Sequence, residues 1–197
     1  MALPAAGVCV SLLYYAAATA AAIRFAKRAT SPLPSLPKIP PRVAVLKPLH
    51  GSSNSLAANL VSFLEIAYPR VDFYFGVENY EDAAAEIPVA LRQRYQYANI
   101  TLVVGEEPNC SNRKIAKLVK MADRAEKAEV FVLSDADVSV ERGYLKRIVG
   151  ELVADEKTGI VTCAYRARPG GSLASRLEAL YVNTDFLPQL LLAEMIE

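Results

Sequence analysis

From residue 42 onward the chain alternates short apolar runs with longer segments whose apolar residues recur at helical spacing. Strands are predicted at 43–46, 71–77, 100–104, from 130 into Asp135, and 159–163. Helices are predicted between them at about 54–67, 81–97, 113–127 and 144–153, with Pro88 a kink or break in the second. Because strands alternate with helices, the pattern predicts an α/β domain whose mainly parallel sheet has helices on both faces.

The first 23 residues contain no charged side chain, and Arg24, Lys27 and Arg28 follow at once. At about 1.5 Å per residue, the run 3–23 is long enough to cross a hydrocarbon core of about 30 Å. Since the positive charge follows this run, it differs from a cleaved secretory signal, and the positive-inside rule puts the rest of the chain in the cytoplasm. Residues 1–28 are therefore predicted to be a transmembrane signal anchor. Their many alanines leave an amphipathic or buried helix as the alternative.

Five prolines lie between Pro32 and Pro41. Proline fixes φ and removes an amide donor, so residues 29–41 are predicted to be an extended, semi-rigid linker. The globular domain is then expected to cover 42–197. Its last segment, 173–197, has apolar residues at partly helical spacing, interrupted at Pro188. This segment is predicted to lie at a binding site or membrane surface, or to be a core helix packed on the sheet.

Composition narrows the function classes. A chain of 197 residues, 53% of them apolar, can build one well-buried domain and a small additional element. The net charge of +1 gives no support to a nucleic-acid partner. Three widely spaced cysteines and a single histidine argue against a zinc site or a disulfide framework, and they fit a reducing compartment.

The fourth apolar run ends in two carboxylates one residue apart, Asp135 and Asp137. Ligands of open α/β sheets bind beyond the carboxyl ends of the strands. A hard divalent cation held by one or two protein carboxylates usually completes its shell with phosphate oxygens and water. The pair therefore suggests a metal–diphosphate site, with turn chemistry or a helix cap as the ordinary alternative.

Other polar loops are expected at the same edge of the sheet. The first strand runs into 47–51 and the second into 78–82, while 109–114 precedes the third helix. In that last loop Arg113 and Lys114 bring positive charge suited to a diphosphate at a helix N-terminus. Each loop taken singly is also explained by turn residues or solvated charge. Their convergence on one edge favours a binding site.

Four ordered motifs carry a resemblance to a known family. They are Val45-Leu46-Lys47-Pro48-Leu49-His50-Gly51, Phe75-Gly76-Val77-Glu78-Asn79, Ser111-Asn112-Arg113-Lys114 and Ser134-Asp135-Ala136-Asp137. In this order and spacing they resemble the ceramide glucosyltransferase family, glycosyltransferase family 21. Residues 161–166 and 185–188 are most similar to its bacterial branch, the hopanoid-biosynthesis-associated glycosyltransferases.

The resemblance implies a GT-A fold and an inverting transfer of a hexose or N-acetylhexosamine at the cytoplasmic membrane face. The donor would be a UDP-sugar, and the acceptor a membrane lipid, either ceramide or a hopanoid. By position, the residues implied to hold the uridine are Lys47, Pro48, Leu49, Glu78 and Asn79. Asn112 and Lys114 would help to fix the nucleotide. Asp135 and Asp137 would be the catalytic carboxylates, engaging the donor sugar and a Mg²⁺ or Mn²⁺ ion that bridges the diphosphate.

The chain departs from the family pattern in two places. Asn79 stands where many members have an aspartate after the second strand. Members also continue to a third acidic motif, whose aspartate is the general base, and to a Gln/Arg-x-x-Arg-Trp motif. This sequence shows neither motif and contains no tryptophan. The alternative function is therefore a non-catalytic remnant, or half of a split enzyme, that only binds the nucleotide sugar. A nucleotidyltransferase is disfavoured because a glycine-rich basic loop for a triphosphate is lacking.

Overall fold

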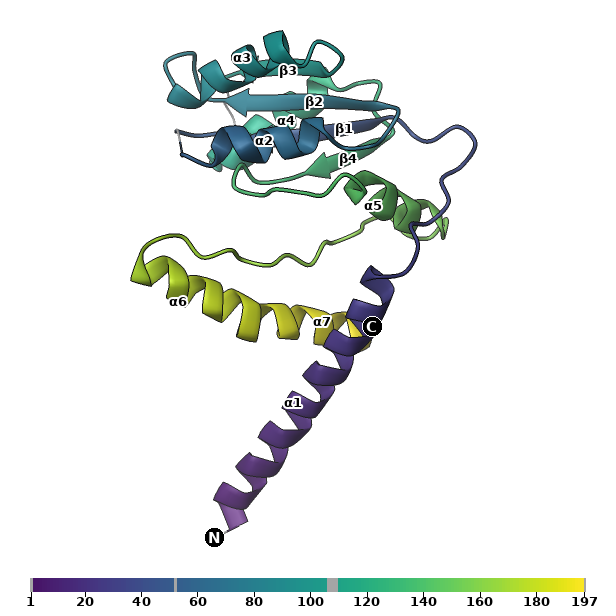
Figure 1. The fold of residues 1–197 in the computed structure, drawn as a ribbon, viewed down its shortest axis with the longest axis vertical. Helices are drawn as coiled ribbons and strands as arrows, with labels where there is room; N and C mark the ends of the chain where they lie inside the picture. Colours follow the sequence, from purple (N-terminus) through teal and green to yellow (C-terminus); the bar gives the residue numbers. More distant parts are fainter. Residues whose placement is uncertain (1, 52, 106–109, 197) are drawn as a thin grey trace. The chain divides into compact units, whose positions relative to one another are not determined.

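The computed structural model describes residues 2–51, 53–105 and 110–196. The chain divides into two compact units, which are described separately (Figure 1). One unit is Leu33–Thr158, and the other combines Met1–Pro32 with Gly159–Glu197. The sequence-based division into 1–28, 29–41 and 42–197 stays a prediction.

The Leu33–Thr158 unit is built on a four-stranded sheet. Its strands are β1 (Val43–Pro48), β2 (Val71–Val77), β3 (Asn99–Val104) and β4 (Val130–Leu133). Their order is β3-β2-β1-β4, and every neighbouring pair is parallel. The first four predicted strands and the parallel pairing are thus confirmed. Because the chain proceeds from β1 to β2 and β3 and then returns to the other side of β1, the order reverses between β1 and β4.

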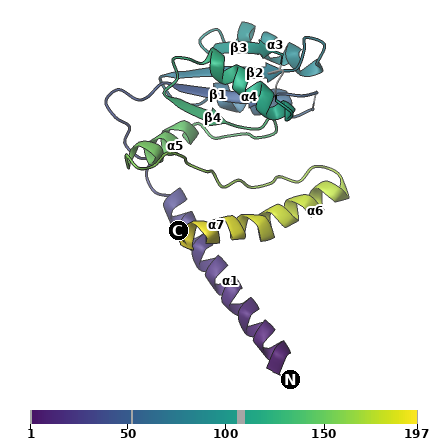
Figure 2. The ribbon, with the colours of Figure 1, turned by 180° about the vertical axis from the view of Figure 1, so that it is seen from behind.

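Helices cover both faces of this sheet. Figure 1 has α2 (Leu56–Leu64) in front of the strands, whereas Figure 2, seen from behind, has α4 (Arg113–Arg124) in front. On the first face α2, α3 (Glu86–Arg94) and α5 (Tyr144–Val153) contribute to the larger core. Alternate residues of β1 serve the two faces: Val43 and Val45 lie in this core, and Ala44 and Leu46 pack with α4.

The second predicted helix is shorter than expected. A 3₁₀ turn, η1 (Ala83–Ala85), precedes α3, and α3 ends at Arg94. Pro88 is the third residue of α3, inside the first turn, where its missing amide would have had no intrahelical acceptor. Proline is therefore accommodated here without the predicted kink.

The predicted fifth strand, 159–163, is wrong. These residues have no strand pairing, and Ile160 is 85% exposed. A strand requires a hydrogen-bonded neighbour, and the run belongs to the other unit, whose described residues contain helices and no sheet. Among the described residues no strand pairs with the outer edge of β4, and Phe131 and Leu133 of β4 are 45% and 60% exposed.

Two linker prolines contact the sheet-containing unit, Pro34 at α5 and Pro41 at Tyr68. A Cβ on Gly150 would lie 2.3 Å from Cγ of Pro34, so only glycine permits this approach. Tyr68 donates its hydroxyl to the Pro41 carbonyl at 2.8 Å. Residues 33–42 contain no helix or strand, and they are held against the domain by these contacts.

The second unit consists of helices. They are α1 (Ala2–Ala29), α6 (Leu173–Tyr181), the π-helical turn η2 (Val182–Phe186) and α7 (Leu187–Ile196). Helix α7 packs against α1, where Leu191, Ala18 and Ala21 are buried and Arg28 pairs with Glu194 at 2.5 Å. Residues Ala6–Ala29 of α1 are long and apolar enough to cross a membrane. The predicted interruption near Pro188 takes the form of η2, which ends two residues before the proline.

Candidate functional site

Loops from four elements meet beyond the carboxyl ends of β1, β2 and β4. Lys114, at the start of α4, lies 2.5 Å from Asp135 after β4, and the neighbouring Arg113 lies 3.0 Å from Glu78 after β2. The loop after β1 joins them, because His50 contacts Asp82 at 3.3 Å. The structure therefore brings together the loops that the sequence assigned to one edge of the sheet. Asn109 of the predicted anion-binding loop lies outside the described residues.

The start of α4 is fixed by its cap. Asn112 accepts hydrogen bonds at Oδ1 from the amides of Lys114 and Ile115, at 3.0 and 3.2 Å. Such a cap satisfies two of the free amides at a helix N-terminus. It also orients Lys114 towards Asp135, and both side chains of that pair are more than half exposed. The nucleotide contacts implied for Asn112 and Lys114 stay predictions.

Asn79 has a comparable local task after β2. Its Oδ1 accepts from the amides of Glu81 and Asp82, at 3.0 and 2.9 Å, and so forms the turn that leads into η1. Glu78 points its carboxylate to Arg113. The uridine contacts implied for Glu78 and Asn79 stay predictions.

Asp82 ties the β1 loop to the β2 loop. Its Oδ1 accepts from the amides of Gly51 and Ala84, each at 2.9 Å, and its side chain is 6% exposed. Burial alone would raise the pKa of Asp82, but these amides and His50 outweigh burial and hold the pKa below its usual value. Gly51 has φ +62°, a left-handed conformation that glycine adopts without steric cost.

Lys47, at the end of β1, is completely buried, with 0% exposure. Its Nζ donates to Ser134 Oγ at 3.1 Å, to the Asp135 carbonyl at 2.7 Å and to the Val138 carbonyl at 3.3 Å. It also lies 3.8 Å from the centre of the Phe63 ring. Burial lowers the pKa of Lys47 to about 7, and the charges of Asp137 and Asp135 oppose that shift.

Leu49 is also buried, with 0% exposure, and its amide donates to the Gly76 carbonyl at 2.7 Å. Its carbonyl accepts from Nζ of Lys117, a buried residue of α4, at 3.0 Å. Of the three residues implied to hold the uridine in this loop, only Pro48 is partly exposed. A uridine contact by Lys47, Pro48 or Leu49 stays a prediction.

The sequence did not reveal that three side chains link the loops of this edge by hydrogen bonds: Ser134, Asp82 and Lys117. Lys117 had a visible signal, since it precedes the buried Met121 by one helical turn and so puts a charge on the apolar face of α4. Ser134 had no such signal, because the role of its hydroxyl depends on a hydrogen bond from Lys47 of β1, which is distant in the sequence.

The donor set at Asp135 and Asp137 suits a hard cation. Both side chains are exposed and offer only carboxylate oxygens. In the part of the chain that the structure describes, no group of three or more His, Cys, Asp or Glu side chains could hold a metal ion. A cation here would therefore take most of its ligands from phosphate and water, as Mg²⁺ commonly does. The assignment of the metal to these two residues stays a prediction.

Comparisons with known proteins show what this chain is similar to. The family model described as Glycosyl transferase family 21 matches residues 3–197. Ceramide glucosyltransferase 1 of Caenorhabditis elegans is 26% identical over 145 residues, which are 74% of this chain and 31% of that protein. The ceramide glucosyltransferase of Komagataella phaffii is 26% identical over 151 residues, 75% of this chain and 29% of that protein. The chain thus spans under a third of the length of these relatives.

Among solved structures, a mannosyltransferase from Pyrobaculum calidifontis in complex with GDP-Man and Mn²⁺ has a similar fold. The TM-score is 0.57 at 23% identity, over 82% of this chain and 47% of the other. This likeness, together with the parallel sheet covered on both faces, confirms the predicted α/β GT-A-like fold.

Proposed function

Because this chain belongs to glycosyltransferase family 21, and is therefore a glycosyltransferase, we propose that it transfers a hexose or N-acetylhexosamine from a UDP-sugar to a membrane lipid with inversion. The observation that carries the proposal is the convergence of Asp135, Asp137 and Lys114 beyond the carboxyl ends of β1 and β4. Carboxylates for a cation and an ammonium for phosphate oxygens are the groups that a sugar diphosphate requires.

In this proposal Asp135 and Asp137 hold Mg²⁺ or Mn²⁺ and engage the donor sugar. The cation supplies stabilisation of the charge that develops on the departing UDP. Lys114 and Asn112 help to fix the nucleotide, while Pro48, Glu78 and Asn79 are proposed to contact the uridine. The Mn²⁺ ion in the complex of the Pyrobaculum calidifontis mannosyltransferase supports a divalent metal for this fold.

The acceptor is proposed to be a membrane lipid, and α1 to anchor the protein. The two relatives named ceramide glucosyltransferase support ceramide, while residues 161–166 and 185–188 favour a hopanoid. Arg24, Lys27 and Arg28 follow the apolar run of α1, which supports a cytoplasmic catalytic domain. Helix α6 exposes one apolar stripe, proposed to lie against the membrane surface: Leu173, Leu177, Leu180 and Tyr181.

The proposal is tested by titrating UDP into the full chain in detergent, with and without Mn²⁺. We expect Mn²⁺ to strengthen UDP binding, and the Asp135→Ala/Asp137→Ala variant to lose that increment. The control is Asp123→Ala/Glu126→Ala, which removes two exposed acids elsewhere and so changes the net charge equally. The metal assignment is contradicted if both variants lose the Mn²⁺ increment equally, or if Mn²⁺ does not change UDP binding by the wild type.

The reaction itself is tested with radiolabelled UDP-glucose and UDP-N-acetylglucosamine, each supplied with vesicles that contain ceramide or a hopanoid. A labelled glycolipid identifies both substrates. Binding without transfer supports the alternative, in which these residues only bind the nucleotide sugar.

A further inference from the structure

We propose that Lys47 is a positioning residue that holds the carboxylate loop, residues 134–138, in shape, and that it makes no contact with the nucleotide. This inference rests on the proposed function, because that loop carries the two aspartates proposed to hold the cation. It assigns to Lys47 a role different from the uridine contact that the family resemblance implies.

The hydrogen bonds of the ammonium reach both ends of the carboxylate loop. Lys47 Nζ donates to Ser134 Oγ and to the Asp135 carbonyl at the start of the loop, and to the Val138 carbonyl at its end. The Val138 amide in turn donates to the Asp135 carbonyl at 3.3 Å. One ammonium therefore fixes the backbone on both sides of Asp137.

An ammonium has three N–H donors and no acceptor. All three donors of Lys47 are matched by the three acceptors of the carboxylate loop. The remaining side of the group faces the Phe63 ring at 3.8 Å, and the residue is 0% exposed. A nucleotide would find neither a free donor nor an open path to this side chain.

Helix α2 supplies a second brace to the same loop. Asn59 donates its side-chain amide to the Ala136 carbonyl at 3.2 Å, and Ser62 Oγ accepts from the Val140 amide at 3.1 Å. These bonds hold the middle of the loop and the residues after it, but they carry no charge. When protonated, Lys47 also brings positive charge behind Asp135 and Asp137, where it offsets the repulsion between the two carboxylates before a cation arrives.

The test compares Lys47→Met with Lys117→Met. Methionine keeps the length and apolar stem of lysine but removes the donors. Lys117 is a matched control, because it is also buried and also binds a backbone carbonyl, that of Leu49, outside the carboxylate loop. Two quantities are measured on the full chain in detergent: amide hydrogen exchange of residues 134–138, and UDP binding with and without Mn²⁺.

For Lys47→Met we expect exchange in residues 134–138 to quicken, and Mn²⁺-dependent UDP binding to weaken about tenfold, as is typical when a partner behind a metal ligand is removed. UDP binding without Mn²⁺ should not change. Lys117→Met should leave the exchange of these residues and the Mn²⁺ dependence as in the wild type.

Three outcomes would overturn the inference. The first is weaker UDP binding by Lys47→Met without Mn²⁺, which indicates a direct nucleotide contact. The second is unchanged exchange and unchanged Mn²⁺ dependence in that variant. The third is an equal effect in Lys117→Met, which indicates a general loss of packing.

A milder variant decides the matter if Lys47→Met does not fold. Ser134→Ala removes one of the three acceptors, and we expect the same changes at about threefold, since a hydrogen bond contributes modestly to free energy. No change in Ser134→Ala would then overturn the inference. If instead the wild type shows no Mn²⁺-dependent UDP binding, the proposed function fails, while the exchange data still decide whether Lys47 shapes the loop.

Discussion

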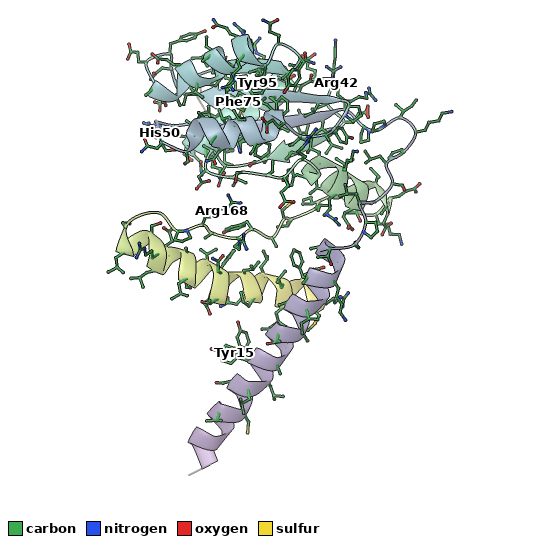
Figure 3. The ribbon with its side chains drawn as sticks, in the orientation of Figure 1. Tyr15, Arg42, His50, Phe75, Tyr95 and Arg168 are labelled. Carbon is green, nitrogen blue, oxygen red and sulfur yellow. The ribbon has the colours of Figure 1, made fainter. Side chains whose placement is uncertain are left out.

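Charged pairs are more buried at the amino ends of the strands than at the carboxyl ends. Figure 3 shows Arg42 at the first end and His50 at the second. At the amino ends, Arg42 donates to both carboxylate oxygens of Asp72, at 2.6 and 3.0 Å. Asn99 of β3 donates to the same carboxylate at 2.9 Å. The Asp72 side chain is only 11% exposed, so its charge is satisfied within the fold.

At the carboxyl ends the pairs are looser. Asp135 and Lys114 are 56% and 54% exposed, and they are joined by one contact, from Lys114 Nζ to one carboxylate oxygen of Asp135. Arg113, opposite Glu78, is 71% exposed. Water and ligands reach these groups, so their pairs can be exchanged for contacts with phosphate or metal at little cost.

Burial therefore separates charges that maintain the fold from charges available for binding. Lys47 and Asp82 are exceptions, because both lie at the carboxyl ends of the strands and yet are buried and bonded within the fold. Four predictions on three variants test this comparison, in order of decreasing effect.

Asp72→Ala should have the largest effect on stability. It leaves Arg42 and Asn99 without their shared acceptor, and we expect the free energy of unfolding to fall by about 2 kcal/mol. Urea unfolding of the detergent-solubilised chain measures the change. Binding of UDP with Mn²⁺ should stay as in the wild type; a loss of binding would show that the two ends are coupled.

The contribution of Asp72 should disappear in acid. Burial alone would raise the pKa of Asp72, but hydrogen bonds from Arg42 and Asn99 and the charge of Arg42 outweigh burial and lower the pKa. The stabilisation is therefore present above the unfolded pKa of about 3.9, and it is lost as the pH falls through the lower, folded value. The stability difference between wild type and Asp72→Ala should shrink below about pH 4. A constant difference down to pH 2 would contradict this account.

Lys114→Met should have opposite effects on two ligands. It frees the Asp135 carboxylate, so Mn²⁺ alone should bind about twofold to fivefold tighter, as expected for the loss of an exposed ion pair. It also removes an ammonium proposed to contact phosphate, so UDP should bind more weakly at saturating Mn²⁺. Titrations with each ligand separate the effects, and parallel changes in both affinities would rule out an exchangeable pair.

Glu78→Gln should have the smallest effect on stability. Its partner Arg113 lies largely in water, and exposed pairs contribute less than about 1 kcal/mol. We expect the urea midpoint to move by less than about half of the shift in Asp72→Ala. A comparable shift would mean that the charged pairs at the carboxyl end stabilise the fold as much as those at the amino end.

Hydrophobic spacing was sufficient to predict the four strands of the sheet and helix α5, because buried faces impose a period on the sequence. It was insufficient for 159–163, since an apolar run resembles a strand whether or not a neighbour is present to pair with it. Fold class followed from the alternation of elements and needed no contact information.

The candidate site was predictable in location but less so in detail. Strand order places the loops on one edge, yet the pairing of Lys114 with Asp135 depends on tertiary packing that spacing does not encode. The inward direction of Lys47 was available in principle, because it shares the face of Val43 and Val45 in β1. The family motif emphasises the charge of Lys47, whereas the alternation of side chains between the two faces of β1 indicates that Lys47 is buried.

The outer edge of β4 is a position at which the sheet could accept a further strand. At the opposite edge β3 exposes polar Asn99 and Thr101, whereas β4 exposes Phe131 and Leu133 beside a backbone edge that no described strand pairs with. Unpaired backbone next to apolar side chains is a template for another strand. In concentrated solution, self-association of this chain should therefore begin at β4, and a charged residue in place of Leu133 should suppress it.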